Sequence, residues 1–235
     1  MKLNFEPKTK LEKFALKVYF SLVENFSRTY LVGGTVRDLL LDKKIQDIDI
    51  ATSAKPNEVA NCLKKFFIDT NLGYIQYGVI LAVEGKMSIA IASFRKDLPS
   101  FSRYPKIKFV DSAKVDSFRR DFTVNSLYFS PKTKKIIDYH SGLKDLKNKK
   151  LRFIGKAKKR IQEDPLRIIR ALRFCLSLSF KLEKNTKKSI RDNFFLVENL
   201  SESRIKTEIQ KLQNIKQRQI LENALSKREL LDKYF

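Results

Sequence analysis

The sequence contains few of the residues on which several common kinds of site depend. Its two cysteines, Cys62 and Cys175, lie far apart in apolar, helix-like surroundings, so we predict neither a disulfide framework nor a zinc site. The single histidine, His140, follows a strand-like stretch and is interpreted as a turn residue. No apolar run approaches the roughly eighteen residues that span a bilayer, and the first residues do not resemble a signal peptide. We therefore expect a cytoplasmic protein without a membrane partner.

Acidic residues are also scarce relative to basic ones. The 235 residues include 49 Lys and Arg against 26 Asp and Glu, which gives a formal net charge of +23. A surface of this sign most often binds nucleic acid, although a lysine-rich composition accounts for part of the excess. Hydrophobic residues make up 43% of the chain, enough to form a core.

Hydrophobic periodicity divides the chain into two parts. Residues 1–142 are predicted to form a mixed α/β unit, and residues 143–235 to be helical. In the first part we expect a helix over 11–26, a strand over 45–51, a helix that starts at Pro56, a hairpin of strands 77–83 and 87–94, and short strands over 107–110 and 123–129. In the second part we expect helices near 157–178, 183–194, 201–213 and 216–232.

The first informative motif joins a glycine pair to two aspartates. Gly33-Gly34 is followed by Arg37, and then by Asp47 and Asp49. A glycine turn that opens a helix lets the backbone approach phosphates, and Arg37 could add a charge-assisted bond. Alternate residues of a strand share a face, so the two carboxylates would point together and could hold two Mg²⁺ ions around a triphosphate. A Walker-type loop is absent, which excludes the usual ATPase and GTPase phosphate site.

Two further motifs are rich in arginine. One runs from Arg119 to Leu127, and the other from Arg160 to Phe174. On a single helix, Asp164 and Arg167 would be neighbours. Such a pair could form an intrahelical ion pair, or it could match the Watson–Crick edge of an incoming base.

Over roughly residues 28–213, these three motifs closely resemble the class II transfer-RNA nucleotidyltransferase and bacterial poly(A) polymerase family. The resemblance implies an α/β head of the polymerase-β nucleotidyltransferase type, followed by an all-α neck. In the head, Gly33, Gly34 and Arg37 would bind the triphosphate, and Asp47 and Asp49 would be the catalytic carboxylates that hold two Mg²⁺ ions.

The resemblance also assigns roles to the arginine-rich motifs. Arg120, Asp121 and Asn125 would contact the ribose, and Asp164 and Arg167 would select CTP or ATP. Three further arginines would give supporting contacts to nucleotide or RNA, namely Arg119, Arg160 and Arg170. The segment 202–209 resembles a brace for the helix that carries the base-selecting pair, and the segment 94–105 resembles a loop that re-aims this pair between nucleotides.

The sequence departs from the family pattern in two places. Ala90 stands where relatives often carry a glutamate, and the chain ends at Phe235, which predicts a short form lacking most of the family's body and tail. We expect the basic segment 143–160 and the C-terminal helices to bind transfer RNA through charge. The activity implied is template-independent addition of CCA to transfer RNA from CTP and ATP. Alternatives are a poly(A) polymerase, a CC-adding or A-adding enzyme, and an inactive RNA-binding protein.

Overall fold

The computed structural model describes residues 2–98, 106–226 and 229–235, and it contains two compact units. Unit 1 comprises residues 1–120 and 125–139, and unit 2 comprises residues 121–124 and 140–235. The chain thus passes from unit 1 to unit 2 and back within the segment that carries Arg120, Asp121 and Asn125. Residues 99–105, in the segment compared above with a re-aiming loop, lie outside the described residues.

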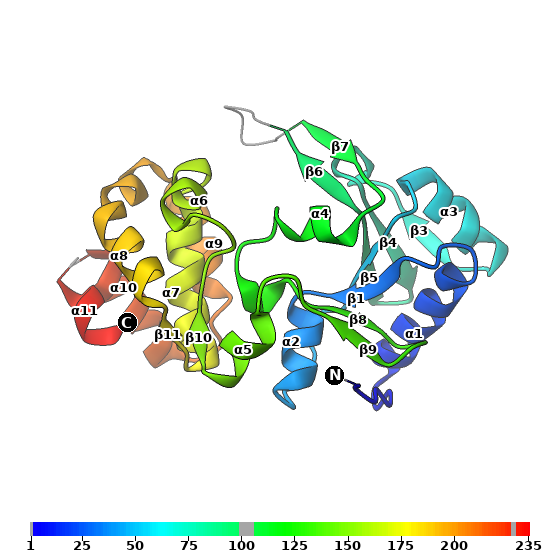
Figure 1. Ribbon diagram of the computed structural model, residues 1–235, viewed down its shortest axis with the longest axis horizontal. Helices are drawn as coiled ribbons and strands as arrows, with labels where there is room; N and C mark the ends of the chain where they lie inside the picture. Colours follow the sequence, from blue (N-terminus) through cyan, green and yellow to red (C-terminus); the bar gives the residue numbers. More distant parts are fainter. Residues whose placement is uncertain (1, 99–105, 227–228) are drawn as a thin grey trace. The chain divides into compact units, whose positions relative to one another are not determined.

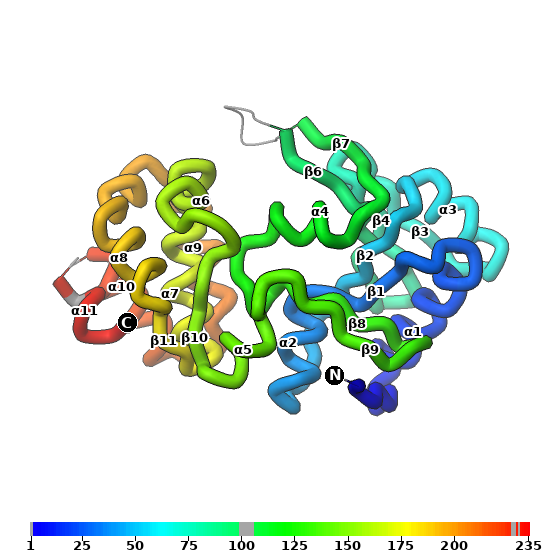
Figure 2. The backbone as a smooth tube through the Cα atoms, in the orientation of Figure 1, coloured from blue at the N-terminus to red at the C-terminus, as the bar shows by residue number. Residues whose placement is uncertain are grey.

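Unit 1 is built on a seven-stranded sheet with the order β3-β4-β5-β2-β1-β8-β9 (Figure 1). Its strands are β1 (Thr29–Val32), β2 (Asp49–Thr52), β3 (Asp69–Asn71), β4 (Val79–Glu84), β5 (Met87–Ser93), β8 (Tyr128–Ser130) and β9 (Lys135–Ile137). Neighbouring strands are antiparallel except β2 and β5, which are parallel and pair Asp49 with Ala90. The two strands β6 (Arg95–Asp97) and β7 (Ile107–Phe109) form a separate antiparallel pair (Figure 2).

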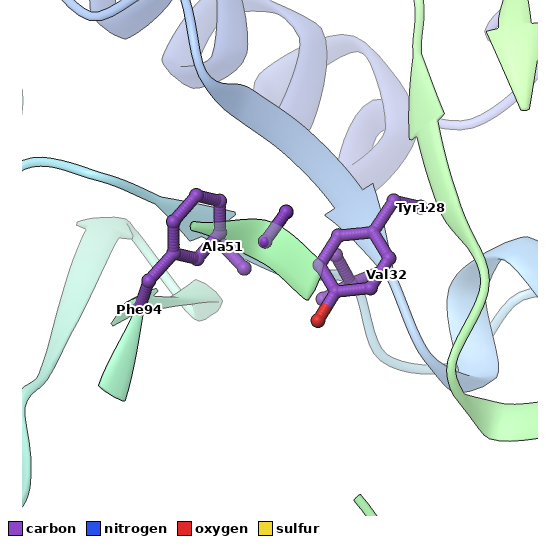
Figure 3. Close-up of a cluster of buried hydrophobic side chains, with 5 residues drawn as sticks. Val32, Ala51, Phe94 and Tyr128 are labelled. Atoms are coloured by element: carbon purple, nitrogen blue, oxygen red, sulfur yellow. The ribbon is translucent and has the colours of Figure 1, made fainter. Parts of the chain in front are cut away.

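Two of the helices of unit 1 begin at local sequence signals. The helices of this unit are α1 (Lys10–Val23), α2 (Gly34–Leu40), α3 (Pro56–Lys65) and α4 (Ala113–Ser117), with a 3-10 turn at Ile75–Tyr77. Thr9 and Glu12 form a capping box at the start of α1, and Pro56 occupies the first position of α3. Helix α1 packs against α3, β1 and β5. Part of the core, shown in Figure 3, joins Val32, Ala51, Phe94 and Tyr128, and Ala113 belongs to the same cluster.

Unit 2 is mainly helical. It contains α5 (Gly142–Lys147), α6 (Ala157–Glu163), α7 (Leu166–Leu178), α8 (Lys184–Asp192), α9 (Glu202–Gln210), α10 (Ile215–Ser226) and α11 (Leu230–Tyr234), with a 3-10 segment at Phe194–Asn199. A short parallel pair joins β10 (Lys150–Leu151) to β11 (Lys181–Leu182). Helix α7 packs against α6, α9 and α10 (Figure 1). Within the described ranges, every helix is too short or too polar to span a bilayer.

Residues 121–124 are held firmly in unit 2. The rings of Phe122 and Phe153 stack with their centroids 4.8 Å apart, and the Thr123 hydroxyl donates to Asp145 Oδ2 at 2.7 Å. The backbone amide of Ile154 also donates to the carbonyl of Asp121. These contacts fix the position of Asp121 relative to the helices of unit 2.

Some of the element boundaries expected from the sequence are confirmed, and others are wrong. The hairpin of β4 and β5 and the start of α3 at Pro56 are confirmed. The strand expected over 45–51 begins only at Asp49, and the strand expected over 123–129 is a 3-10 turn (Thr123–Asn125) followed by β8.

The helix expected over 157–178 is in fact two helices. Asp164 ends α6 in an extended conformation, with φ −155° and ψ 103°, and α7 begins after Pro165. The proline ring disfavours a helical conformation at the residue before it, and proline has no backbone N–H to donate within a helix. The break therefore follows from one residue.

Candidate active site

The glycine turn after β1 brings several of the predicted residues together. Gly33 adopts φ 69° and ψ −130°, a conformation that glycine reaches without a Cβ clash, and α2 begins at the next residue. A Cβ built on Gly33 would lie 3.3 Å from Arg120 NH1 and 3.9 Å from Asp49 Oδ2. A guanidinium and a carboxylate thus both lie beside the Cβ position of this turn.

The side chain of Thr35 ties the aspartate segment to this turn. Thr35 Oγ1 accepts a hydrogen bond from the backbone amide of Asp49 at 3.0 Å and donates to the carbonyl of Asp47 at 3.4 Å. Thr35 is 1% exposed and lies in the first turn of α2. Sequence reasoning missed it, because a threonine after two glycines carries no signal of such a contact.

Asp47 and Asp49 are exposed, whereas Ile48 and Ile50 are buried. The expected alternation is therefore present, although Asp47 precedes the strand rather than lying in it. The pKa of Asp49 is raised above its usual range. Displacement of water by the surrounding protein is the main cause; the charge of Arg120 opposes the shift and that of Asp47 adds to it.

The chemistry of these two carboxylates suits a divalent cation. Mg²⁺ is commonly held by one or two carboxylates and completes its shell with water and substrate phosphates. Across the described parts of the chain, no cluster of three or more acidic, histidine or cysteine side chains offers a site built from protein alone. Ala90, opposite Asp49 on β5, supplies no third carboxylate. The residues present therefore fit a cation shared between the protein and a phosphate.

Arg37 is buried beside the turn. Its Nε and NH2 donate to the two carboxylate oxygens of Asp38, both at 2.8 Å, and its NH1 donates to Asn125 Oδ1 at 2.6 Å. A Cβ built on Gly34 would lie 3.5 Å from Arg37 NH2. The structure thus brings Asn125 to Arg37, from which it is separated by 88 positions in the sequence, at the turn formed by Gly33 and Gly34.

Arg119 and Arg120 share a buried acidic partner. Arg119 Nε donates to Asp116 Oδ1 at 2.7 Å, and Arg120 NH2 donates to Asp116 Oδ2 at 3.2 Å. Asp116 was not among the predicted site residues. Its spacing of three and four residues from the two arginines was the signal that could have found it.

In unit 2, Asp121 pairs with Arg170. Arg170 Nε donates to Asp121 Oδ2 at 3.0 Å, its NH2 donates to the same oxygen, and its NH1 lies 3.6 Å from Glu208 Oε1. Burial is the largest single influence on the pKa of Arg170, and it lowers the pKa. The charge of Asp121 and its hydrogen bond together outweigh burial, so the net shift is upward.

Of the two alternatives that the sequence left open for Asp164 and Arg167, the ion pair between them is not formed in the part of the chain that the structure describes. Because Pro165 breaks the helix, Arg167 NH1 donates instead to Glu163 Oε2 at 2.8 Å and to the carbonyl of Arg160 at 2.6 Å. Arg160 NH1 donates to the same Glu163 oxygen at 2.6 Å. Glu163, which sequence reasoning missed, therefore forms one ion pair with Arg160 within α6 and another with Arg167 of α7.

Asp164 has partners of its own. Its Oδ1 accepts hydrogen bonds from Arg204 NH2 at 2.9 Å and from the backbone amide of Leu166 at 3.2 Å. Glu208, which lies on α9 together with Arg204, accepts a hydrogen bond at Oε2 from Arg173 Nε of α7 at 2.8 Å. Helix α9 therefore braces α7, as expected for the segment 202–209.

The fold is that of a polymerase-β-type nucleotidyltransferase head followed by a helical region. Residues 29–152 match the family described as the poly A polymerase head domain, and residues 179–223 match the description "probable RNA and SrmB-binding site of polymerase A". The chain belongs to the poly A polymerase head-domain family.

Similar proteins include CCA-adding enzymes of Lactobacillus delbrueckii and Streptococcus uberis. They are 42% and 40% identical to this chain, respectively, over 200 residues. Those residues make up 84% of this chain, 49% of the Lactobacillus protein and 48% of the Streptococcus protein. The chain thus spans about half the length of the curated relatives it matches.

Two solved structures are similar in fold. The Bacillus stearothermophilus CCA-adding enzyme in complex with CTP has a TM-score of 0.76 at 33% identity, covering 86% of this chain and 48% of that one. A tRNA nucleotidyltransferase complexed with a primer tRNA and an incoming ATP analog has a TM-score of 0.70 at 32% identity, covering 86% and 58%.

Proposed function

We propose that the chain is a template-independent RNA nucleotidyltransferase that adds CCA to the 3′ end of transfer RNA, using CTP and ATP. One observation carries the proposal: Thr35 ties the backbone of Asp47 and Asp49 to the first turn of α2, and the carboxylate of Asp49 lies beside the Gly33 turn. The similarity to CCA-adding enzymes, one of them in complex with CTP, supports this substrate choice.

In this proposal, residues 1–142 form the catalytic head. Asp47 and Asp49 would hold two Mg²⁺ ions, which stabilise negative charge on the attacking and leaving oxygens when bound. Gly33 and Gly34 let the backbone approach the triphosphate, and Arg37 adds positive charge there. The absence of a third carboxylate at Ala90 leaves the two aspartates as the metal ligands.

Residues 143–235 form the neck, which contributes to nucleotide choice and RNA binding. Asp164 and Arg167 select the base, while Arg120, Asp121 and Asn125 contact the ribose. The contacts of Asp164 with Arg204 and of Arg167 with Glu163 support this role, because they limit the rotation of two otherwise flexible side chains. Supporting contacts to nucleotide or RNA come from Arg119, Arg160 and Arg170.

The reaction is an in-line substitution at phosphorus. The 3′-hydroxyl of the RNA gives up its proton to water, and its oxygen forms a bond to the α-phosphorus of the nucleotide. The bond between that phosphorus and the oxygen it shares with the β-phosphate breaks, and pyrophosphate leaves. Positioning and charge neutralisation supply most of the acceleration. We place this activity in the cytoplasm, a compartment that the two buried cysteines, neither in a disulfide, suit well.

The test uses the full chain with Mg²⁺ and transfer RNA that lacks its CCA end, with CTP, ATP or both. Extension by CCA when both nucleotides are present supports the proposal. Long A tails would identify a poly(A) polymerase, addition of only CC or only A would identify a partial enzyme, and no extension would favour an inactive RNA-binding protein.

Two matched variants assign the chemistry to the aspartates. Asp49→Asn should abolish extension with every nucleotide while transfer-RNA binding persists. Asp69→Asn replaces an exposed aspartate that likewise begins a strand of the same sheet, and it should extend normally. Full activity of Asp49→Asn would refute the metal role.

A further inference from the structure

Asp116 is a completely buried carboxylate, 0% exposed, in the last turn of α4. Its Oδ1 accepts from Arg119 Nε at 2.7 Å and from the backbone amide of Arg95 at 3.2 Å. Its Oδ2 accepts from the Tyr128 hydroxyl at 2.7 Å and from Arg120 NH2 at 3.2 Å. Both oxygens are thus used twice, and every partner belongs to unit 1.

The consequence of this network lies in the orientation of Arg120. Arg120 Nε donates to the Tyr128 hydroxyl at 3.1 Å, and its guanidinium carbon lies 5.0 Å from the centre of the Tyr128 ring. The opposite end of the guanidinium, NH1, is the atom nearest to the Cβ position of Gly33. Asp116 and Tyr128 therefore hold one edge of the guanidinium, so that the other edge borders the glycine turn.

We propose that Asp116 is a positioning residue for nucleotide binding: through Arg120, it fixes a positive charge against the Gly33 turn, where the triphosphate binds. Arg120 thus contacts the triphosphate in addition to the ribose. This inference rests on the proposed function. An arginine side chain loses much rotamer freedom when it is held in one orientation, and a buried carboxylate supplies the charge-assisted bonds that compensate for this loss.

The charge state of Asp116 agrees with this role. Burial raises its pKa, but the charges of Arg119 and Arg120 and the hydroxyl of Tyr128 outweigh burial, so the net shift is downward and the carboxylate is ionised. An asparagine could not replace it, because one carbonyl oxygen cannot accept four bonds and the amide nitrogen, in the place of either oxygen, would face a guanidinium donor.

The decisive experiment measures equilibrium binding of CTP and of inorganic tripolyphosphate, both with Mg²⁺, to the full chain and to Asp116→Asn, Arg120→Ala and the double variant. Asp116→Asn should weaken both ligands about tenfold, as expected when a charge-assisted contact is lost. In the Arg120→Ala background it should cause no further loss, because the two residues act in series. In the extension assay, KM for CTP should rise more than kcat falls.

Tyrosine variants separate positioning from general stability. Tyr128→Phe removes the hydroxyl that accepts from Arg120 and should weaken tripolyphosphate binding severalfold. Tyr19→Phe removes another buried hydroxyl of unit 1, hydrogen-bonded to Ser130 at 3.0 Å, and should leave binding unchanged. This comparison also decides the matter if Asp116→Asn fails to fold.

Several outcomes would overturn the inference. One is an unchanged affinity of Asp116→Asn for tripolyphosphate. If that variant does not fold, the inference is contradicted when Tyr128→Phe and Tyr19→Phe bind tripolyphosphate with equal affinity. Additive losses in the double variant, or weaker CTP binding with unchanged tripolyphosphate binding, would also contradict it. If the unmodified chain binds neither ligand, the proposed function fails instead, whatever the variants show.

Discussion

Arg204 of α9 donates a hydrogen bond to Asp164 at 2.9 Å, whereas Arg167 turns away from Asp164 to Glu163. The two residues assigned to base selection are therefore held by different anchors. Asp164 is fixed by a helix 40 residues further along the chain, and Arg167 by the end of the preceding helix. Base selection in the proposed enzyme should thus depend on the anchors as well as on the pair itself.

Removal of the Arg204 anchor should lower nucleotide selectivity. In Arg204→Ala, Asp164 still accepts a hydrogen bond from the backbone amide of Leu166 but loses its charged partner. Its carboxylate should therefore occupy several orientations. We expect the ratio of kcat/KM for the correct and incorrect nucleotide to fall about tenfold, the size of one charge-assisted bond. Lys206→Ala, which removes an exposed ion pair with Glu202 on the same helix, is the matched control. Equal selectivity in the two variants would argue against the anchor.

Loss of the Arg167 guanidinium should disturb base choice more than chemistry. Arg167→Ala removes the proposed donor to the base but leaves Asp47 and Asp49 unchanged. Single-nucleotide extension with CTP, ATP, GTP and UTP should show increased misincorporation, with a smaller drop in the best rate. Arg191→Ala, an exposed arginine of α8, should keep normal selectivity. Unchanged base choice in Arg167→Ala would contradict the assignment of Arg167 to base selection.

Local patterns made much of the fold predictable. Pro56 marks the start of α3, and the apolar runs on both sides of Glu84 and Gly85 predict the β4–β5 hairpin, because these signals act within a few residues. Pro165 is itself a helix stop signal, but the apolar residues keep helical spacing on both sides of it, so the break was not predicted from the sequence.

Long-range pairing could not be predicted in the same way. The bonds from Arg37 to Asn125 and from Arg204 to Asp164 join residues separated by 88 and 40 positions, which no local period reports. The motif around Arg120 shows the same limit. Its adjacent residues Arg120 and Asp121 contact different units, a division set by the packing of Phe122 on Phe153 rather than by the motif itself.

A methyl group at Gly33 should impair both folding and nucleotide binding. Gly33→Ala forces a side chain into a positive-φ conformation, which costs about 1–3 kcal/mol, and displaces Arg120 NH1 from the turn. Gly85→Ala supplies the control, because Gly85 also has a positive φ of 59° but nothing lies within 4 Å of its Cβ position. Urea unfolding should show both variants destabilised, while CTP binding should weaken only in Gly33→Ala.

The stability of the neck should depend on pH through Glu208. Burial raises the pKa of this carboxyl, but its bond to Lys211 and the charges of Arg173 and Arg170 outweigh burial, so the net shift is downward. A carboxyl with a lowered pKa stabilises the folded state above its unfolded-state value, 4.5, and this contribution is lost as the pH falls below it.

Glu208→Gln should therefore reduce the free energy of unfolding by about 1–3 kcal/mol at neutral pH, and by less in acid. Chemical denaturation of both proteins at neutral pH and below the unfolded-state pKa measures this difference. Glu222→Gln, at an exposed position on α10, should change stability little at either pH. A destabilisation by Glu208→Gln that is equal at both pH values would show that its charge is not responsible.

Transfer-RNA binding should weaken steeply with salt, and the basic surface of residues 143–160 should account for part of the slope. Each phosphate neutralised by a lysine releases counterions, which contributes about 0.7–0.9 to the slope of log K against log salt. Lys158 and Lys159 are exposed on α6, and Lys64 and Lys65 form another exposed pair on α3. Replacing either pair with glutamine removes the same net charge.

We expect a shallower slope and weaker binding only for Lys158→Gln with Lys159→Gln, because those side chains would contact phosphates directly. Equal losses from both pairs would mean that net charge alone attracts the RNA.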